Sequence, residues 1–117
     1  MDLNEYQRRC QDTAIYPDLG RNLVYPALGI ADEAGEIAGK VKKFIRDTGY
    51  RTGAGARSQL SDDQVHAVAL EIGDVMWYCA AMANELGINL DVIAQWNLGK
   101  LADRKARDTL QGNGDYR

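Results

Sequence analysis

Histidine, cysteine and proline are scarce in this chain of 117 residues, which has one histidine, two cysteines and two prolines. His66 alone cannot supply the imidazoles that the paired Glu-x-x-His motifs of a di-iron carboxylate bundle need. Cys10 and Cys79 form no C-x-x-C motif, so we expect neither a zinc site nor a catalytic thiol, and we expect two reduced, mostly buried cysteines rather than a disulfide. With 45% hydrophobic residues, the composition is typical of a folded chain.

Long apolar runs and a large excess of positive charge are absent too. Acidic, amide or glycine residues interrupt the apolar stretches before the ~18 residues of a membrane span, and the first nine residues are polar, unlike a signal peptide. We therefore expect a cytoplasmic protein with no membrane partner. The formal net charge is -3, with basic residues mixed among the acidic ones, so we expect no polynucleotide partner.

Apolar residues recur at helical spacing through nearly the whole chain, and no segment alternates as a strand would. This pattern predicts a single all-α domain over residues 1–117, an antiparallel bundle of four main helices. The predicted helices cover about 4–14, 25–47, 62–86 and 90–107.

Local signals predict the helix ends. Ser61 and Gln64 form a capping-box pattern at the start of the third helix, Gly87 ends that helix, and Asn89 is expected to cap the fourth. Three glycines and two arginines between positions 48 and 60 predict a mobile connection. We expect the fourth helix to carry four apolar side chains inward, Val92, Ile93, Trp96 and Leu101.

Two acidic motifs, Glu33–Glu36 and Glu71–Asp74, lie on the second and third helices. Residues i and i+3 of a helix lie within ~60° of each other, so each motif directs two carboxylates to one side. Gly35, Gly39 and Gly73 lie inside these helices, where glycine costs ~1 kcal/mol relative to alanine, so we expect a packing reason for them, such as a close helix approach. Four converging carboxylates need a cation, and an all-oxygen ligand set favours Mg²⁺ first and Mn²⁺ second.

A single Glu-x-x-Glu motif is more often a solvated helix face than a metal site, but two copies on adjacent long helices favour the metal site. Lys40 and Lys43 follow the first motif. They fit either surface salt bridges with Glu36 or contacts to a substrate phosphate, and the sequence leaves both open.

The residues around the motifs resemble those of MazG-type nucleotide pyrophosphohydrolases, which belong to the all-α NTP pyrophosphatases. The resemblance covers roughly Tyr25 to Arg117, including Glu-x-x-Glu followed by Glu-x-x-Asp and the segment from Asn97 to Arg104. The spacer between the motifs is somewhat long. The resemblance implies a compact single-domain member whose bundle is completed by oligomerisation, as a homodimer or homotetramer in which a neighbouring subunit can complete the site.

The activity that the resemblance implies is Mg²⁺-dependent hydrolysis of a (d)NTP to the (d)NMP and pyrophosphate. It implies metal ligands at Glu33, Glu36, Glu71 and Asp74, and we take Glu36 as the candidate general base. The candidate phosphate contacts are Lys40, Lys43, Lys100 and Arg104. The candidate base or sugar contacts are Tyr78, Trp96 and Asn97, whereas Trp77 is expected to pack in the core.

The sequence leaves two alternative functions open. A related enzyme could act specifically on dUTP or on a phosphoribosyl-nucleotide. A non-catalytic helical module could bind a nucleotide or a protein partner with the same acidic motifs. The small residues Ala80, Ala81 and Ala83 on the third helix, with the apolar flank of so short a bundle, predict a homo-oligomer.

Overall fold

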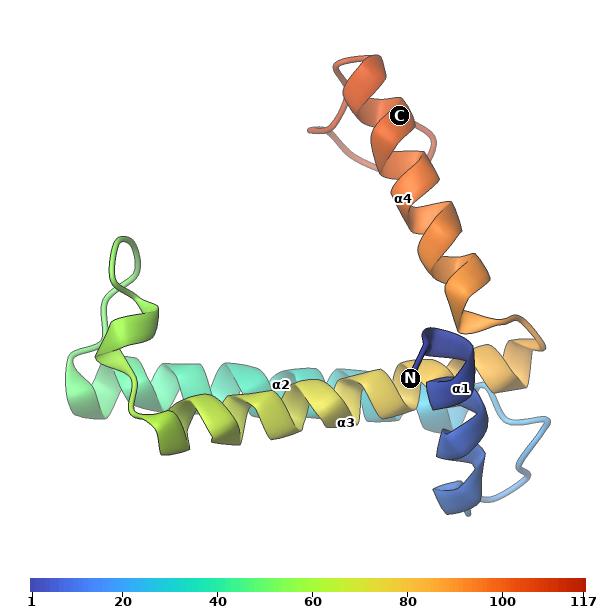
Figure 1. The fold of residues 1–117 in the computed structure, drawn as a ribbon, viewed down its shortest axis with the longest axis horizontal. Helices are drawn as coiled ribbons and strands as arrows, with labels where there is room; N and C mark the ends of the chain where they lie inside the picture. The colour runs from blue at the N-terminus through green and yellow to red at the C-terminus, as the bar shows by residue number, and fades with distance from the viewer.

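Two long antiparallel helices form the body of the protein in the computed structural model, which describes residues 1–117 (Figure 1). A short helix crosses one end of this pair, and the last helix projects away from it. The chain contains no strand, so the all-α prediction is confirmed. In chain order the elements are α1 (Leu3–Cys10), the 3-10 turn η1 (Gln11–Thr13), α2 (Val24–Thr48), the 3-10 turn η2 (Arg57–Gln59), α3 (Asp62–Leu86) and α4 (Leu90–Ala106).

The predicted capping signals set the ends of α3. Ser61 Oγ accepts a hydrogen bond from the backbone N–H of Gln64 at 3.2 Å, and Gln64 Oε1 accepts one from the N–H of Ser61 at 2.9 Å. Gly87 ends the helix with φ 65°, and Gly49 ends α2 in the same way with φ 69°. These bonds satisfy backbone groups that a bare helix end leaves unpaired.

The start of α4 is held by α1 rather than by the side chain of Asn89, which occupies the N-cap position without making a capping bond. Gln7 is buried, and its Oε1 accepts from the N–H of Leu90 at 2.6 Å while its Nε2 donates to the carbonyl of Ile88 at 2.9 Å. Asn4 Oδ1 accepts from the N–H of Asp91 at 3.3 Å. The expected cap by Asn89 is therefore wrong, because a tertiary contact supplies the acceptors.

Little of a single chain is buried. Only eight of the 117 residues are buried, and three of them, Ala80, Ala81 and Ala83, lie on α3 near its contact with α1. Cys10 is buried, Cys79 is half-buried, and both are free thiols. Large apolar side chains are exposed on all three long helices, among them Leu28, Leu70, Ile72, Met76, Trp96 and Leu98. Such exposed apolar surface is typical of a protein that binds another protein surface.

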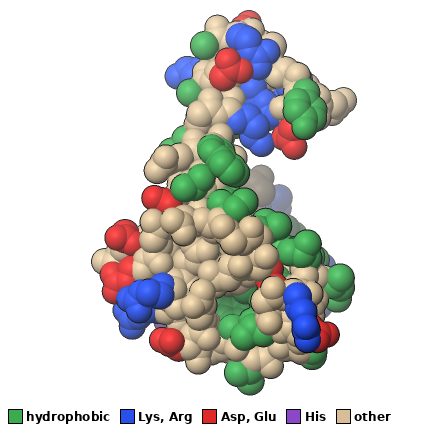
Figure 2. Space-filling view, turned by 90° about the vertical axis from the view of Figure 1, so that its right-hand side faces the viewer, with side chains coloured by type: hydrophobic (Ala, Val, Ile, Leu, Met, Phe, Trp, Pro, Cys, Tyr) green, Lys and Arg blue, Asp and Glu red, His purple; other side chains and the backbone are tan.

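Helix α4 leaves the body after its first turn, and apolar side chains stand exposed along it (Figure 2). Trp96 is 62% exposed and Leu101 is 39% exposed, so the expectation that both face inward is wrong within one chain. Val92 and Ile93, nearer α1, are half-buried. Periodicity identified the apolar residues of the helix, but α1 contacts only its first part, and Trp96 and Leu101 stay exposed.

The irregular C-terminal tail folds back on α4. Arg104 is 4% exposed, and its Nη2 donates to the carbonyls of Gly114 and Asp115 at 3.2 and 2.9 Å. Asp115 Oδ1 also lies 3.3 Å from Arg104 Nη2 and 3.0 Å from Lys100 Nζ. The tail is thus tied to the helix by basic side chains.

Helix α3 is long and apolar enough to cross a membrane by length and composition, since an 18-residue window within it has a mean hydropathy of 1.2, although we expected no such segment. Glu71 and Asp74 lie near its middle. Carboxylates at the centre of a bilayer are costly, so packing against protein suits this helix better than contact with lipid.

Candidate functional site

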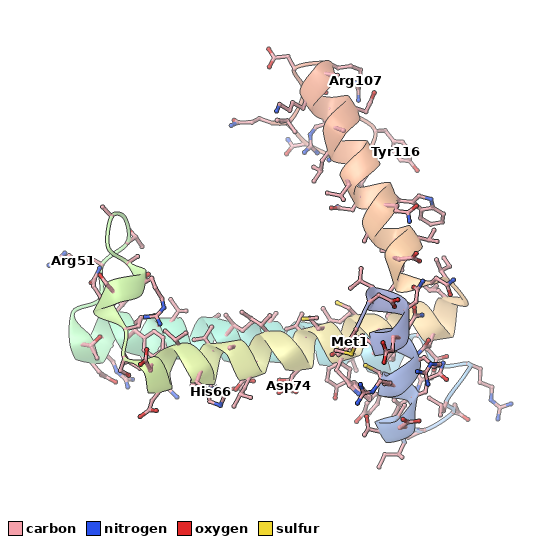
Figure 3. All side chains as sticks on the ribbon, viewed as in Figure 1. Met1, Arg51, His66, Asp74, Arg107 and Tyr116 are labelled. Carbon is pink, nitrogen blue, oxygen red and sulfur yellow. The ribbon has the colours of Figure 1, made fainter.

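Three of the four predicted metal-ligand carboxylates come together midway along the helix pair. Glu33 of α2 and Glu71 and Asp74 of α3 each offer an oxygen, and these oxygens all lie within 4.8 Å of one another. Glu33 and Glu71 are half-buried, and Asp74 is exposed. We refer to these three residues as the acidic cluster. Figure 3 shows Asp74 near the centre of α3.

The acidic cluster carries an excess of negative charge. Desolvation, followed by the charges of Asp74 and Asp32 and then of Glu71 and Glu36, raises the pKa of Glu33. The one ammonium paired with the cluster is that of Lys40, whose Nζ lies 3.1 Å from Glu71 Oε1. A hard divalent cation fits this site, because every donor is a carboxylate oxygen and the carboxylates repel one another.

Glu36 does not join the acidic cluster. It is exposed on α2, one turn beyond Glu33, although its charge contributes to the raised pKa of Glu33. The first motif therefore places one carboxylate against α3 and leaves the other accessible beside it.

The two candidate lysines lie on one side of the cluster. Lys40 pairs with Glu71 of the other helix rather than with Glu36. Lys43 forms no salt bridge within 4.0 Å. Both lysines line a shallow open pocket of about 300 Å³ together with Phe44, Asp63, Gln64 and Ala67.

The glycines of the acidic motifs do not mark the closest contact of the helices. A Cβ atom at Gly35, Gly39 or Gly73 would meet nothing within 4 Å, so the prediction of close approach there is wrong. A Cβ at Gly29 would instead overlap the ring of Tyr78. The two helices are close where the ring of Tyr78 packs on the backbone at Gly29. This contact does not require glycine at the acidic motifs.

Sequence reasoning missed Gly29, although a signal was available. Gly29 lies four residues before Glu33, and Tyr78 lies four residues after Asp74. In an antiparallel pair that brings Glu33 and Asp74 together, the residues one turn away on either helix must also face each other. The same register that forms the cluster thus forms the Gly29–Tyr78 contact.

An aromatic groove lies next to the acidic cluster. The ring centroids of Tyr25 and Tyr78 are 6.4 Å apart with an interplanar angle of 45°. Burial, with smaller contributions from Tyr25 and Glu33, raises the pKa of the Tyr78 hydroxyl. The groove has a volume of about 550 Å³ and is lined by Tyr25, Leu28, Gly29, Ala31, Asp32 and Tyr78. Trp77, predicted to be a core residue, is half-buried and packs edge-on against Tyr78.

The comparison with known protein families agrees with this geometry. A family model described as the MazG nucleotide pyrophosphohydrolase domain matches residues 26–107. This chain belongs to the MazG family. The matched range holds the whole acidic cluster, the Gly29–Tyr78 contact and all of α4.

A phage protein is similar to this chain along the full length of both. The "Gene 37 protein" of Mycobacterium phage L5 is 44% identical over 122 aligned residues, with 100% of both chains covered. Its name states no activity. No solved structure matches the chain at a significant level.

The candidate MazG substrate residues of α4 lie away from the acidic cluster of their own chain. The outer end of α4, where Figure 3 labels Arg107, is far from Asp74. Trp96, Asn97 and Lys100 are exposed, and Arg104 is buried beneath the tail. A single chain of this MazG protein therefore brings the acidic cluster together without Trp96, Asn97, Lys100 or Arg104.

Proposed function

We propose that this protein is a Mg²⁺-dependent nucleoside triphosphate pyrophosphohydrolase that converts a (d)NTP to the (d)NMP and pyrophosphate. One observation carries the proposal, namely the all-carboxylate cluster built from both acidic motifs beside an aromatic groove. Membership of the MazG family supports the reaction class.

Glu33, Glu71 and Asp74 would hold the cation, with Glu36 available from the exposed side. Bound Mg²⁺, or Mn²⁺ as a substitute, supplies neutralisation of the triphosphate and a lower pKa for a coordinated water. The raised pKa of Glu33 supports this assignment, because desolvation and then the neighbouring carboxylates disfavour its charged form, which a bound cation would stabilise.

The side chains around the cluster would bind the substrate and assist proton transfer. Lys40 and Lys43 would bind phosphate oxygens and stabilise the charge that develops on the leaving group. The exposed carboxylate of Glu36 would accept a proton from the attacking water. Tyr78, with Tyr25 across the groove, would stack against the base.

We further propose that the working form is a homodimer or homotetramer, in which Trp96, Asn97 and Lys100 of one subunit complete the site of another. Their exposure on a helix that leaves its own subunit supports this arrangement, as do the exposed apolar side chains of α2 and α3. Arg104 would act indirectly, by holding the tail that pairs with Lys100. A monomeric mass in light scattering at micromolar concentration would contradict this.

The decisive experiment is pyrophosphate release from a panel of NTPs, dNTPs and a phosphoribosyl-nucleotide, with and without Mg²⁺, and with analysis of the nucleotide product. Mg²⁺-dependent formation of NMP supports the proposal, and turnover confined to dUTP or to the phosphoribosyl-nucleotide would narrow it to a more specialised enzyme. Glu33→Gln and Asp74→Asn should abolish turnover, whereas Asp62→Asn, at a fully exposed carboxylate at the start of α3, should retain it. Nucleotide binding without turnover would indicate a sensor instead.

A further inference from the structure

The segment between η1 and α2 is tied to α3 by a single carboxylate. Glu85 Oε1 accepts hydrogen bonds from the Tyr16 hydroxyl at 2.6 Å and from the N–H of Gly20 at 2.9 Å. Glu85 Oε2 accepts a third from the N–H of Asn22 at 3.0 Å. The Tyr16 hydroxyl, followed by the N–H of Asn22, lowers the pKa of Glu85. The ionised carboxylate thus holds three donors at once.

Glu85 acts on Tyr25 by two routes. Tyr16 is buried, and its ring stacks on that of Tyr25 with centroids 4.9 Å apart and planes 14° apart. Asn22, held by the same carboxylate, accepts at its Oδ1 from the N–H groups of Val24 and Tyr25 at 3.1 and 3.0 Å. One route supports the ring of Tyr25, and the other caps the helix turn that carries it.

Tyr25 in turn forms one wall of the aromatic groove, opposite Tyr78. Tyr25 is 42% exposed, and its ring stacks on Tyr16, which does not line the groove. This stacking restrains the ring of Tyr25. Glu85 itself lies eleven residues beyond Asp74 on α3, about 16 Å along the helix axis. It is too far away to contact a phosphate bound at the acidic cluster.

We infer that Glu85 is a positioning residue for base recognition: it fixes Tyr16 and the start of α2 so that Tyr25 stays opposite Tyr78 across the groove. This inference rests on the proposed function, because it takes the groove as the place where the base of the nucleotide binds. Base-dependent affinity should depend on Glu85, whereas affinity for the phosphate chain should not.

The test compares a nucleotide with a ligand that has no base. For wild type and Glu85→Gln, we would measure KM and kcat for a nucleoside triphosphate in Mg²⁺, and the inhibition constant of inorganic tripolyphosphate. The amide of Gln cannot accept all three donors equally, so KM should rise about fivefold, the range of one lost aromatic contact, with kcat and the tripolyphosphate constant within about twofold. An equal loss of affinity for the nucleotide and for tripolyphosphate would mean that the substitution distorts the whole site. An unchanged KM would mean that Glu85 has no positioning role. Either result overturns the inference.

A second pair of variants keeps the test decisive if Glu85→Gln does not fold. Tyr16→Phe loses the hydroxyl bond to Glu85 but retains the stacked ring, whereas Tyr16→Leu loses both. The inference expects Tyr16→Leu to raise KM at least as much as Glu85→Gln does. Tyr16→Phe should raise KM less, because Glu85 still accepts from the N–H groups of Gly20 and Asn22 and the stacked ring remains. A wild-type KM in Tyr16→Leu contradicts the inference. A wild-type protein that neither binds nor hydrolyses nucleotides in Mg²⁺ would overturn the proposed function as well, whereas an active wild type with these variants unaffected overturns the inference alone.

Discussion

The ring of Tyr78 on α3 packs directly on the backbone of α2 at Gly29, in space that any other side chain would fill. Glu33 lies one turn after Gly29, and Asp74 lies one turn before Tyr78. This contact therefore contributes to the spacing and register of the two helices where their carboxylates meet. It also forms part of the aromatic groove beside them.

Gly29→Ala tests this contact. The added methyl would overlap three ring carbons of Tyr78, so the ring must rotate or the helices must separate. We expect a loss of about 1–3 kcal/mol in the free energy of unfolding, measured by urea denaturation, and a higher KM for nucleotides. Gly35→Ala is the matched control, because a Cβ there meets nothing within 4 Å and alanine should stabilise the helix by up to about 1 kcal/mol. Equal stability of the two variants would contradict the packing described.

Mg²⁺ should stabilise the folded protein through the acidic cluster. At ten times its dissociation constant, the ion should add about 1.4 kcal/mol to the free energy of unfolding, equivalent to several degrees in Tm. Glu33→Gln and Asp74→Asn should lose most of this shift, whereas Asp62→Asn should keep it. Thermal unfolding with and without Mg²⁺ measures the effect, and a shift of the same size in all four proteins would place the ion elsewhere.

The three lysines that follow the first acidic motif should differ in how much each contributes to triphosphate binding. Lys40 and Lys43 line the pocket beside the cluster, whereas the neighbouring Lys42 is exposed and does not line it. Lys40→Met and Lys43→Met should each weaken binding of a non-hydrolysable triphosphate about fivefold, as expected for one partly exposed charged contact, with Lys42→Met unchanged. Titration calorimetry measures the three affinities. Comparable losses in all three variants would indicate a general charge effect instead.

The stability of the protein should depend on pH through Glu85. Its lowered pKa means that the native state binds fewer protons than the unfolded chain, so its contribution is complete above the ordinary value of 4.5 and is lost as the pH falls through the lower native value. Glu85→Gln should therefore be less stable than wild type at pH 7, and the difference should narrow as the pH falls below 4.5. Urea denaturation across this range measures it, and a difference that does not vary with pH would argue against the ionised carboxylate as its source.

Arg104 should hold the C-terminal tail rather than a ligand. Its guanidinium is buried and bonded to the tail at Gly114 and Asp115. Arg104→Met should therefore speed the amide hydrogen exchange of residues 110–117 while leaving α2 and α3 protected, because it removes the hydrogen bonds that hold the Gly114 and Asp115 carbonyls against α4. Lys105→Met, at an exposed neighbour, is the control. Unchanged exchange of the tail in Arg104→Met would show that other contacts hold it.

The sequence by itself determined the helices, the ends of α3 and the acidic character of the candidate site. Ser61 with Gln64 and Gly87 act within a few residues of the helix ends, so their effect depends on the local chain alone. The two acidic motifs could also be recognised from the sequence. Two carboxylates three residues apart on a helix lie on the same face of that helix before any tertiary contact forms.

Only the tertiary structure decided which of these side chains meet. It brought Glu33 to Glu71 and Asp74 but left Glu36 outside, and it paired Lys40 with Glu71 across the helices. It also assigned the close contact to Gly29 and directed α4 away from the body. The reason is physical: these outcomes depend on the rotation and separation of helices, which many side chains from distant parts of the chain set together.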